Sequence, residues 1–345
     1  MSLYAGSGGM DLGFVRAGAT PVWANELNVD AARAYMGQAS LGRGHMHVGD
    51  ILEQSWPSPH AAELVVGGPP CQGFSVAGRM DPEDPRSQHV VTFLDMVERV
   101  QPQAFVMENV KALAANRRWE GVRTALSERA KQLGYVTQMW VLNAADYSVA
   151  QARERMFLVG TRKDLDPPSV PRKHDKRLTV RAALQHLPPH GNEGNAGICM
   201  AKITFAKNPV LRPSPYAGML FNGQGRPLRL DGASNTLPAS MGGNRTPIID
   251  EVALRTGSRN WIEGYHQHLM AGGAPYAGAT PSQLRRITVQ EAAALQTFPP
   301  GTVFSGTQGA QYAQIGNAVP PNLAFAVASS VLESFGVTSS RGDVA

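Results

Sequence analysis

The residue with the clearest chemical potential is Cys71, in the segment Gly-Gly-Pro-Pro-Cys-Gln-Gly-Phe-Ser at 67–75. The segment follows the apolar stretch 64–66, which is typical of a buried strand. Two prolines hold the backbone extended before the thiol, and the glycines allow another molecule to approach closely. Most isolated cysteines are buried and structural. A thiol presented after a strand, where α/β sheets place their active sites, is instead a candidate nucleophile.

A carboxylate and two arginines are candidates to assist this thiol. Glu108 closes an apolar run and is followed by Asn109. If the strands before Cys71 and before Glu108 are neighbours, thiol and acid meet at one sheet edge. Arg153 and Arg155 alternate ahead of another apolar run, so both can point the same way and neutralise a carboxylate or bind an anion. Taken singly, each is more often an ordinary strand end or surface pair.

A glycine-rich turn, Gly6-Ser7-Gly8-Gly9, follows a short apolar stretch near the N-terminus. Glu26 ends the second expected strand, and Asp50 follows the third. Such a turn with an acidic residue on the next strand is typical of a site for a nucleoside-type cofactor. The spacing differs from the dinucleotide fingerprint Gly-x-Gly-x-x-Gly, which disfavours a nicotinamide-dependent dehydrogenase. A purely structural tight turn is the alternative.

The elements that position these residues follow an α/β pattern in the first 160 residues. Short apolar runs alternate with amphipathic stretches, which predicts a doubly wound, mostly parallel sheet. Strands are expected at 3–4, 21–25, 63–66, 103–107, 136–142 and 156–160, and helices near 90–100 and 119–133.

Prolines and glycines break any long helix after about residue 164, which predicts a smaller, loop-rich domain. The apolar helix expected at 322–335 needs a large surface to bury it, so we expect it to return to the first domain. The predicted divisions are 1–165, 166–305 and 306–345.

Composition and charge limit the function classes. With 43% hydrophobic residues in 345, the chain can bury one large core and a smaller second one. It has no run of about 18 apolar residues and no signal-peptide pattern, so a cytoplasmic location is expected. Residues 1–100 hold 6 basic and 11 acidic side chains, whereas 162–300 hold 17 Lys and Arg against 9 Asp and Glu. The basic region suits a polyanion, but charge alone leaves DNA, RNA and a merely solvated surface open.

Together these motifs resemble one family, the bacterial DNA (cytosine-5-)-methyltransferases of type II restriction–modification systems. The resemblance covers nearly the whole chain in the family's order. It rests on Ser2-Leu3-Tyr4-Ala5-Gly6-Ser7-Gly8-Gly9, Pro69-Pro70-Cys71-Gln72, Glu108-Asn109-Val110, Gln151-x-Arg153-x-Arg155, Arg286-Ile287-Thr288 with Glu291, Leu295, Gln296, Phe298 and Pro299, and Gln314-Ile315-Gly316-Asn317-Ala318-Val319-Pro320-Pro321.

The resemblance implies a Rossmann-like fold that uses S-adenosyl-L-methionine, with S-adenosyl-L-homocysteine as product and no metal. It implies that Cys71 attacks carbon 6 of a flipped cytosine while Glu108 protonates ring nitrogen 3. Arg153 and Arg155 would position Glu108 and the base, and Asn109 would order the loop that carries Cys71. The implied cofactor-binding residues are Tyr4, Gly6, Gly8, Gly9, Glu26, Asp50, Ile51, Pro70, Asn317 and Ala318.

The implied partner is double-stranded DNA, and a monomer is expected. Segments 222–226 and 234–238 resemble the family's recognition loops, with Gln224, Arg226 and Thr236 as candidate DNA contacts. Arg79 and Arg86, on the loop after Cys71, are further candidates for DNA contact. A cognate restriction endonuclease acting separately is a potential partner.

Two rivals share the fold. A transfer-RNA cytosine-5 methyltransferase of this kind carries Cys-Phe-Thr in its target domain, a tripeptide that this sequence lacks. A non-catalytic DNA-binding relative would not need Cys71, Glu108, Arg153 and Arg155 intact.

Overall fold

The computed structural model describes residues 1–70 and 88–336, which divide into two compact units. Unit 1 comprises Met1–Tyr147, Arg153–Asp175 and Val319–Ala345, and unit 2 comprises Ser148–Ala152 and Lys176–Ala318. The sequence predicted divisions at 165/166 and 305/306, and the chain passes between the two units at 147/148, 152/153, 175/176 and 318/319.

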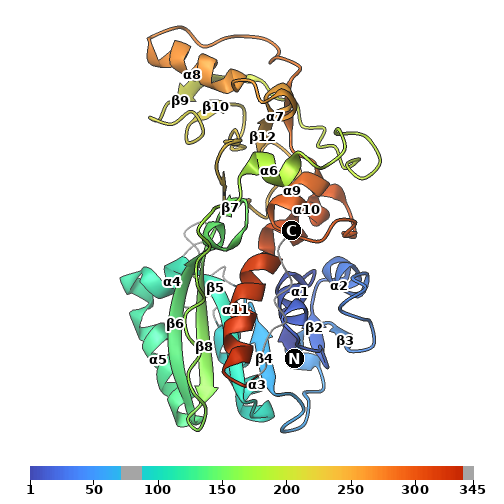
Figure 1. Ribbon diagram of the computed structural model, residues 1–345, viewed down its shortest axis with the longest axis vertical. Helices are drawn as coiled ribbons and strands as arrows, with labels where there is room; N and C mark the ends of the chain where they lie inside the picture. The colour runs from blue at the N-terminus through green and yellow to red at the C-terminus, as the bar shows by residue number, and fades with distance from the viewer. Residues whose placement is uncertain (71–87, 337–345) are drawn as a thin grey trace. The chain divides into compact units, whose positions relative to one another are not determined.

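Unit 1 is built on a seven-stranded sheet of order β3-β2-β1-β4-β5-β8-β6 (Figure 1). The five strands from β3 to β5 run parallel, and β8 is antiparallel to both of its neighbours. This confirms the predicted mostly parallel α/β sheet. A third strand was expected before Asp50 without stated bounds, and the short edge strand β3 lies there. The strands are β1 (Ser2–Leu3), β2 (Ala24–Glu26), β3 (Met46–Val48), β4 (Leu64–Gly67), β5 (Ala104–Val110), β6 (Tyr135–Asn143) and β8 (Glu154–Arg162).

Helices pack on this sheet through apolar faces at helical spacing. In α3 the buried face includes Val90, Phe93 and Val97, which join the core formed with Val65 and Phe105. The helices of unit 1 are α1 (Gly9–Arg16), α2 (Val29–Met36), α3 (His89–Val100), α4 (Lys111–Ala115), α5 (Glu120–Gln132) and α11 (Pro321–Glu333).

Helix α11 packs closely against α1 within unit 1 (Figure 1). A Cβ built at Gly13 would lie 2.4 Å from the backbone nitrogen of Phe325, so the glycine permits this approach. Among the described residues, one helical stretch, Gln308–Glu333, has the length and apolarity of a membrane span. However, 61% of the apolar window in that stretch is buried inside the protein, and core helices pass the same test.

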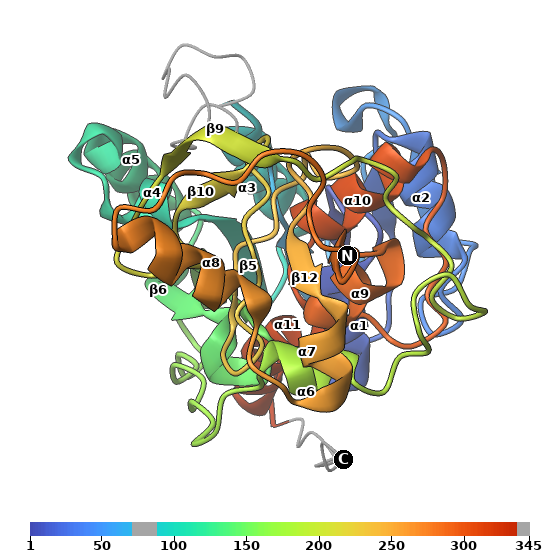
Figure 2. The same cartoon turned by 90° about the horizontal axis from the view of Figure 1, so that it is seen from above.

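Unit 2 is made of short elements and long loops, because prolines and glycines interrupt its chain. One core cluster brings together Leu220 and Phe221 of β10 with Ile262 and Tyr265 of α8, and Figure 2 shows α8 lying along β9 and β10. The strands pair as β9 (Phe205–Val210) with β10 (Met219–Phe221), β12 (Ile248–Asp250) with β13 (Leu284–Arg286), and β7 (Gln151–Ala152) with β11 (Ser234–Asn235). The helices are α6 (Val180–Leu184), α7 (Glu251–Thr256), α8 (Trp261–Met270), α9 (Val289–Leu295) and α10 (Gln308–Asn317).

Candidate active site

The carboxyl ends of β4 and β5 lie side by side, as the sequence argument required. Gly67 is in register with Met107, so the chain leaving β4 passes Glu108. A Cβ built at Gly68 would lie 3.0 Å from Oε2 of Glu108. Asn109 donates from Nδ2 to the carbonyl oxygen of Pro69 over 3.2 Å. Glu108 and Asn109 therefore contact the segment that leads into Cys71, which itself lies outside the described residues.

Glu108 is buried, and Nε of Arg155 lies 2.9 Å from its Oε1. Burial raises the pKa of Glu108, while the positive charges of Arg155 and Arg153 act in the opposite direction. The pKa remains above that of a solvated carboxyl group. Glu108 therefore keeps a proton to higher pH than an exposed glutamate and can act as a general acid.

Strand alternation around β8 explains how both arginines act on Glu108. Arg155 is paired with Val110 across the strands, and Glu154 points away to meet Lys111 at 2.8 Å. Arg153 is 2% exposed, and its charge lowers the pKa of Glu108. Arg153 and Arg155 therefore both contribute to the field at this carboxyl.

The glycine-rich turn is held by Glu26. The backbone N–H groups of Gly6 and Asn28 donate to the two carboxylate oxygens of Glu26, each over 2.8 Å. Gly6 has φ +56, and a Cβ built there meets no atom within 4 Å, so the space above it is open to a ligand. Gly8, with φ +87, has a different role, because a Cβ there would lie 2.4 Å from Leu41. Gly9 begins α1.

An open hollow lies beside this turn. Glu26, Leu27, Asn28, Val29, Asp30 and Arg33 line it. Leu27 is 67% exposed, so the hollow offers apolar surface for a base ring next to a carboxylate suited to ribose hydroxyls. Asp50 accepts from the N–H of Leu52 over 2.9 Å, and Ile51 between them is buried. In residues 1–70 and 88–336, no three His, Cys, Asp or Glu side chains are grouped to hold a metal ion.

Tyr4 has a partner that the sequence did not indicate. Its hydroxyl lies 3.0 Å from Nδ1 of His89, and the rings meet edge to face with centroids 5.5 Å apart. Tyr4 has a positive φ of 55, which is uncommon for a residue other than glycine. Burial raises the pKa of Tyr4, so its hydroxyl stays protonated. The contact joins the glycine-rich turn to the first residue of α3.

The other candidate residues are distributed as follows. Gln224 and Arg226 are exposed in unit 2, and Thr236 donates from Oγ1 to the carbonyl oxygen of Ala152 over 2.9 Å. Asn317 ends α10 and Ala318 follows it, both in unit 2. Pro70 precedes Cys71 in unit 1, and Arg79 and Arg86 lie outside the described residues.

Comparison with known proteins identifies the class. A sequence model of the C-5 cytosine-specific DNA methylases matches residues 1–333. The chain belongs to this family. The predicted enzyme class, a DNA (cytosine-5-)-methyltransferase, is thereby confirmed.

Relatives of the methyltransferase match over nearly its full length. It is 32% identical to the type II methyltransferase M1.HphI of Haemophilus parahaemolyticus, over 96% of this chain and 86% of that protein. It is 31% identical to the type II methyltransferase M.XorII of Xanthomonas oryzae, over 97% of this chain and 84% of that protein. Its fold is similar to that of Schizosaccharomyces pombe Dnmt2 methyltransferase, with TM-score 0.66 and 19% identity over 97% of this chain and 98% of that one.

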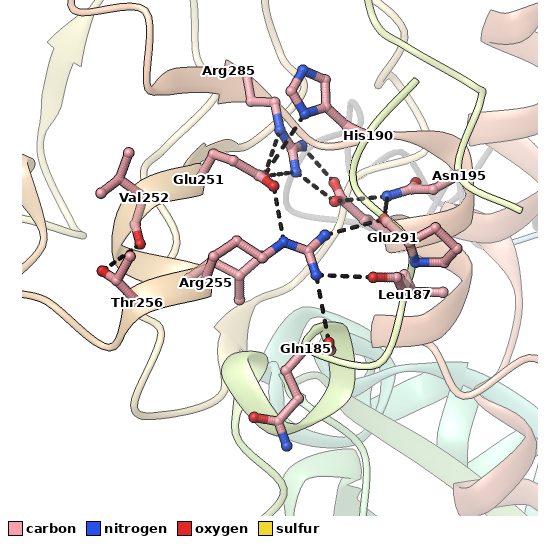
Figure 3. Close-up of polar contacts among 12 residues, drawn as sticks. Gln185, Leu187, His190, Asn195, Glu251, Val252, Arg255, Thr256, Arg285 and Glu291 are labelled. Atoms are coloured by element: carbon pink, nitrogen blue, oxygen red, sulfur yellow. Dashed lines mark hydrogen bonds and ion pairs between the residues drawn. The ribbon is translucent and has the colours of Figure 1, made fainter. Parts of the chain in front are cut away.

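An ion-pair network organises unit 2 of the methyltransferase around Arg285 (Figure 3). Arg285 pairs with Glu251 at the start of α7 and with Glu291 in α9, where Nη2 lies 2.6 Å from Oε1 of Glu291. Glu291 also closes a capping box with Thr288, and Arg255 pairs with Glu251 at 2.9 Å. The sequence motif contained Thr288 and Glu291 but gave no sign of Glu251 as a partner.

Proposed function

We propose that unit 1 of the methyltransferase binds S-adenosyl-L-methionine at the turn around Gly6 and Glu26 and carries out the methyl transfer. The open space above Gly6 and the hollow lined by Glu26 and Leu27 support this placement. When bound, the cofactor supplies an electrophilic methyl group and is released as S-adenosyl-L-homocysteine. Tyr4, Asp50 and Pro70 of the same unit would complete the cofactor site. The roles expected for Asn317 and Ala318 stay predictions.

Covalent attack by Cys71 activates the cytosine. Carbon 5 is a poor nucleophile until electron density is moved onto it. The Cys71 thiolate adds to carbon 6 while Glu108 gives a proton to nitrogen 3, which leaves an enamine whose carbon 5 takes the methyl group. A water molecule then takes the proton from carbon 5, the double bond between carbons 5 and 6 forms again, and the Cys71 thiolate leaves. Nitrogen 3 returns its proton to Glu108. The observation that carries this proposal is a buried carboxyl of raised pKa beside the segment leading into Cys71.

The neighbouring side chains position the reacting groups. Asn109 fixes the carbonyl oxygen of Pro69, two residues before Cys71. Arg155 holds the Glu108 carboxyl at 2.9 Å, and Arg153 adds positive charge. Arg155 and Arg153 thereby keep the carboxyl oriented toward the base.

Unit 2 is the target-recognition unit in this proposal. A cytosine inside a duplex cannot reach the thiol, so it must be flipped out at a cost of a few kcal/mol. Gln224, Arg226 and Thr236 are the proposed contacts in unit 2, with Arg79 and Arg86 contributing from the segment after Cys71. The protein would act as a monomer in the bacterial cytoplasm, alongside a restriction endonuclease of the same specificity.

Methylation of duplex DNA with radiolabelled S-adenosyl-L-methionine, followed by bisulfite sequencing, tests this proposal. The expected result is 5-methylcytosine within one short sequence context, and no label transferred by Cys71→Ala. Transfer RNA serves as the comparison substrate. Label on transfer RNA with none on duplex DNA would contradict the proposal.

A further inference from the structure

Two loops of unit 2 are joined through one carbonyl group. The N–H groups of Gln224 and Gly225 both donate to the carbonyl oxygen of Asn244, over 3.1 and 2.9 Å. Gly223 has φ +73, and a Cβ there would lie 2.4 Å from that same oxygen. Segments 222–226 and 242–246, called here the paired loops, therefore pack closely against each other.

A buried arginine forms hydrogen bonds to both of the paired loops. Arg286 is 2% exposed and donates from Nη1 to the carbonyl oxygen of Thr246 over 2.6 Å. Its Nη2 reaches Oδ1 of Asn222 over 3.4 Å. Because successive side chains of β13 point in opposite directions, Arg285 enters the Glu251 and Glu291 network while Arg286 enters the paired loops.

The outer surface of the paired loops carries two arginines. Arg226 and Arg245 are both exposed, and Nη1 of Arg245 donates to Oγ of Ser240 over 3.2 Å. Within residues 1–70 and 88–336, no carboxylate forms an ion pair with either guanidinium. An exposed guanidinium that remains unneutralised on a rigid loop is suited to the two acceptors on the major-groove edge of guanine.

We propose that Arg245 is a second base-reading residue, that it acts with Arg226 on the same or adjoining base pairs, and that Arg286 is the positioning residue for both. The inference rests on the proposed function, because it assumes that unit 2 reads the duplex. It adds Arg245 and Arg286 to the residues that set the target sequence, and the paired loops become one recognition surface.

The test is methylation of a duplex library in which each base pair around the wild-type site is varied, at one fixed salt concentration. Arg245→Ala should lose roughly 5- to 150-fold of the discrimination at one base pair. Arg226→Ala should do the same at that base pair or an adjoining one. Arg259→Ala is the charge-matched control, since Arg259 is an exposed arginine paired with Glu263 on α8. The control should keep the wild-type pattern.

Arg286→Lys tests the positioning role, because one ammonium cannot hold both acceptors in a fixed geometry. Arg286→Lys should reduce discrimination both at the base pair read by Arg226 and at the one read by Arg245, without changing the Kd of the cofactor. Asn222→Ala removes the only side-chain acceptor among the three groups that Arg286 contacts, the other two being the carbonyl oxygens of Thr246 and Ala201. It disturbs the core less and should relax discrimination at the same two base-pair positions.

The outcomes separate this inference from the proposed function. Wild type that methylates no cytosine in the library would overturn the proposed function. Wild type that methylates one site, with a uniform loss or no loss for Arg245→Ala, would overturn the base-reading role alone. If Arg226→Ala and Arg245→Ala lose discrimination at positions several base pairs apart, the paired loops do not form a single recognition surface. Unchanged discrimination in both Arg286→Lys and Asn222→Ala would overturn the positioning role.

Discussion

Nε of Arg155 lies 2.9 Å from Oε1 of Glu108, where the carboxyl end of β5 pairs with the start of β8. Burial of the carboxyl and the charge of the guanidinium oppose each other in setting the pKa of Glu108. This balance determines over what pH range Glu108 holds a proton.

Glu108→Gln should slow single-turnover methyl transfer by roughly 10²- to 10⁴-fold, because an amide forms hydrogen bonds but supplies no proton at neutral pH. DNA affinity should stay close to that of wild type. Rapid-quench kinetics and a filter-binding titration measure the two quantities. Unaltered chemistry with weakened DNA binding would contradict the acid role.

Arg155→Gln should move the alkaline limb of the pH–rate profile to higher pH. The positive charge of Arg155 lowers the pKa of Glu108, so its removal lets the carboxyl keep its proton further into the alkaline range. Single-turnover rates from pH 6 to 10 in wild type and variant give the shift, whatever the loss in amplitude. A shift toward lower pH would show that the arginine does not act on this proton.

The contact between Tyr4 and His89 predicts a coupled effect on cofactor binding. Tyr4→Phe and His89→Leu should each weaken S-adenosyl-L-methionine binding by about 0.5 to 1.5 kcal/mol, the net worth of one hydrogen bond. Isothermal titration of both variants and of the double variant forms a thermodynamic cycle. Because Tyr4→Phe already removes every hydrogen bond of this hydroxyl to His89, the double variant should bind no worse than Tyr4→Phe. Additive losses would mean that the two side chains act separately.

The ion-pair network of unit 2 predicts a pH-dependent stability. Burial of Glu251 acts to raise its pKa, but its bonds with Arg255 and Arg285 outweigh this and leave the pKa lowered. A carboxylate with a lowered folded pKa contributes stability above its unfolded pKa, about 4.3, and this is lost as pH falls through the folded pKa. Arg285→Ala leaves the fully buried Glu291 without its charged partner. The free energy of unfolding should fall by on the order of 3 to 5 kcal/mol near pH 7.

Arg255→Ala is the matched comparison for Arg285→Ala, since its side chain is 27% exposed and water can replace its bonds. The free energy of unfolding should therefore fall less in Arg255→Ala than in Arg285→Ala. Urea unfolding at pH 7 and at pH 4 measures both variants, and the difference between wild type and Arg285→Ala should shrink at the lower pH. An equal loss at both pH values would argue against an ionic origin.

Local patterns in the sequence were sufficient to predict the type of sheet and part of the candidate site. Apolar runs marked β4 and β5, and the motifs at their ends placed Glu108 next to the segment before Cys71. The third strand was expected only from its place before Asp50, because β3 is a three-residue edge strand with a mostly exposed surface, and no apolar run gives its bounds.

Contacts between distant segments could not be predicted from the sequence. Tyr4 and His89 are 85 positions apart and meet only because β1 and α3 pack in one unit. The adjacent residues Arg285 and Arg286 look equivalent in the sequence, and only the pairing of β13 with β12 sends them to different partners. The close packing of Asn244 on Gly223 likewise depends on tertiary structure.

The central claim is that Cys71 forms a covalent bond to the target cytosine, and the most direct measurement is mass spectrometry of a trapped adduct. Duplex DNA with 5-fluorocytosine at the methylated position is incubated with the protein and S-adenosyl-L-methionine, with Cys71→Ser as control. Fluorine cannot leave as a proton does, so the account predicts a stable protein–DNA adduct whose digested peptide carries the modification on Cys71. No adduct, or one attached to the buried Cys199, would contradict it.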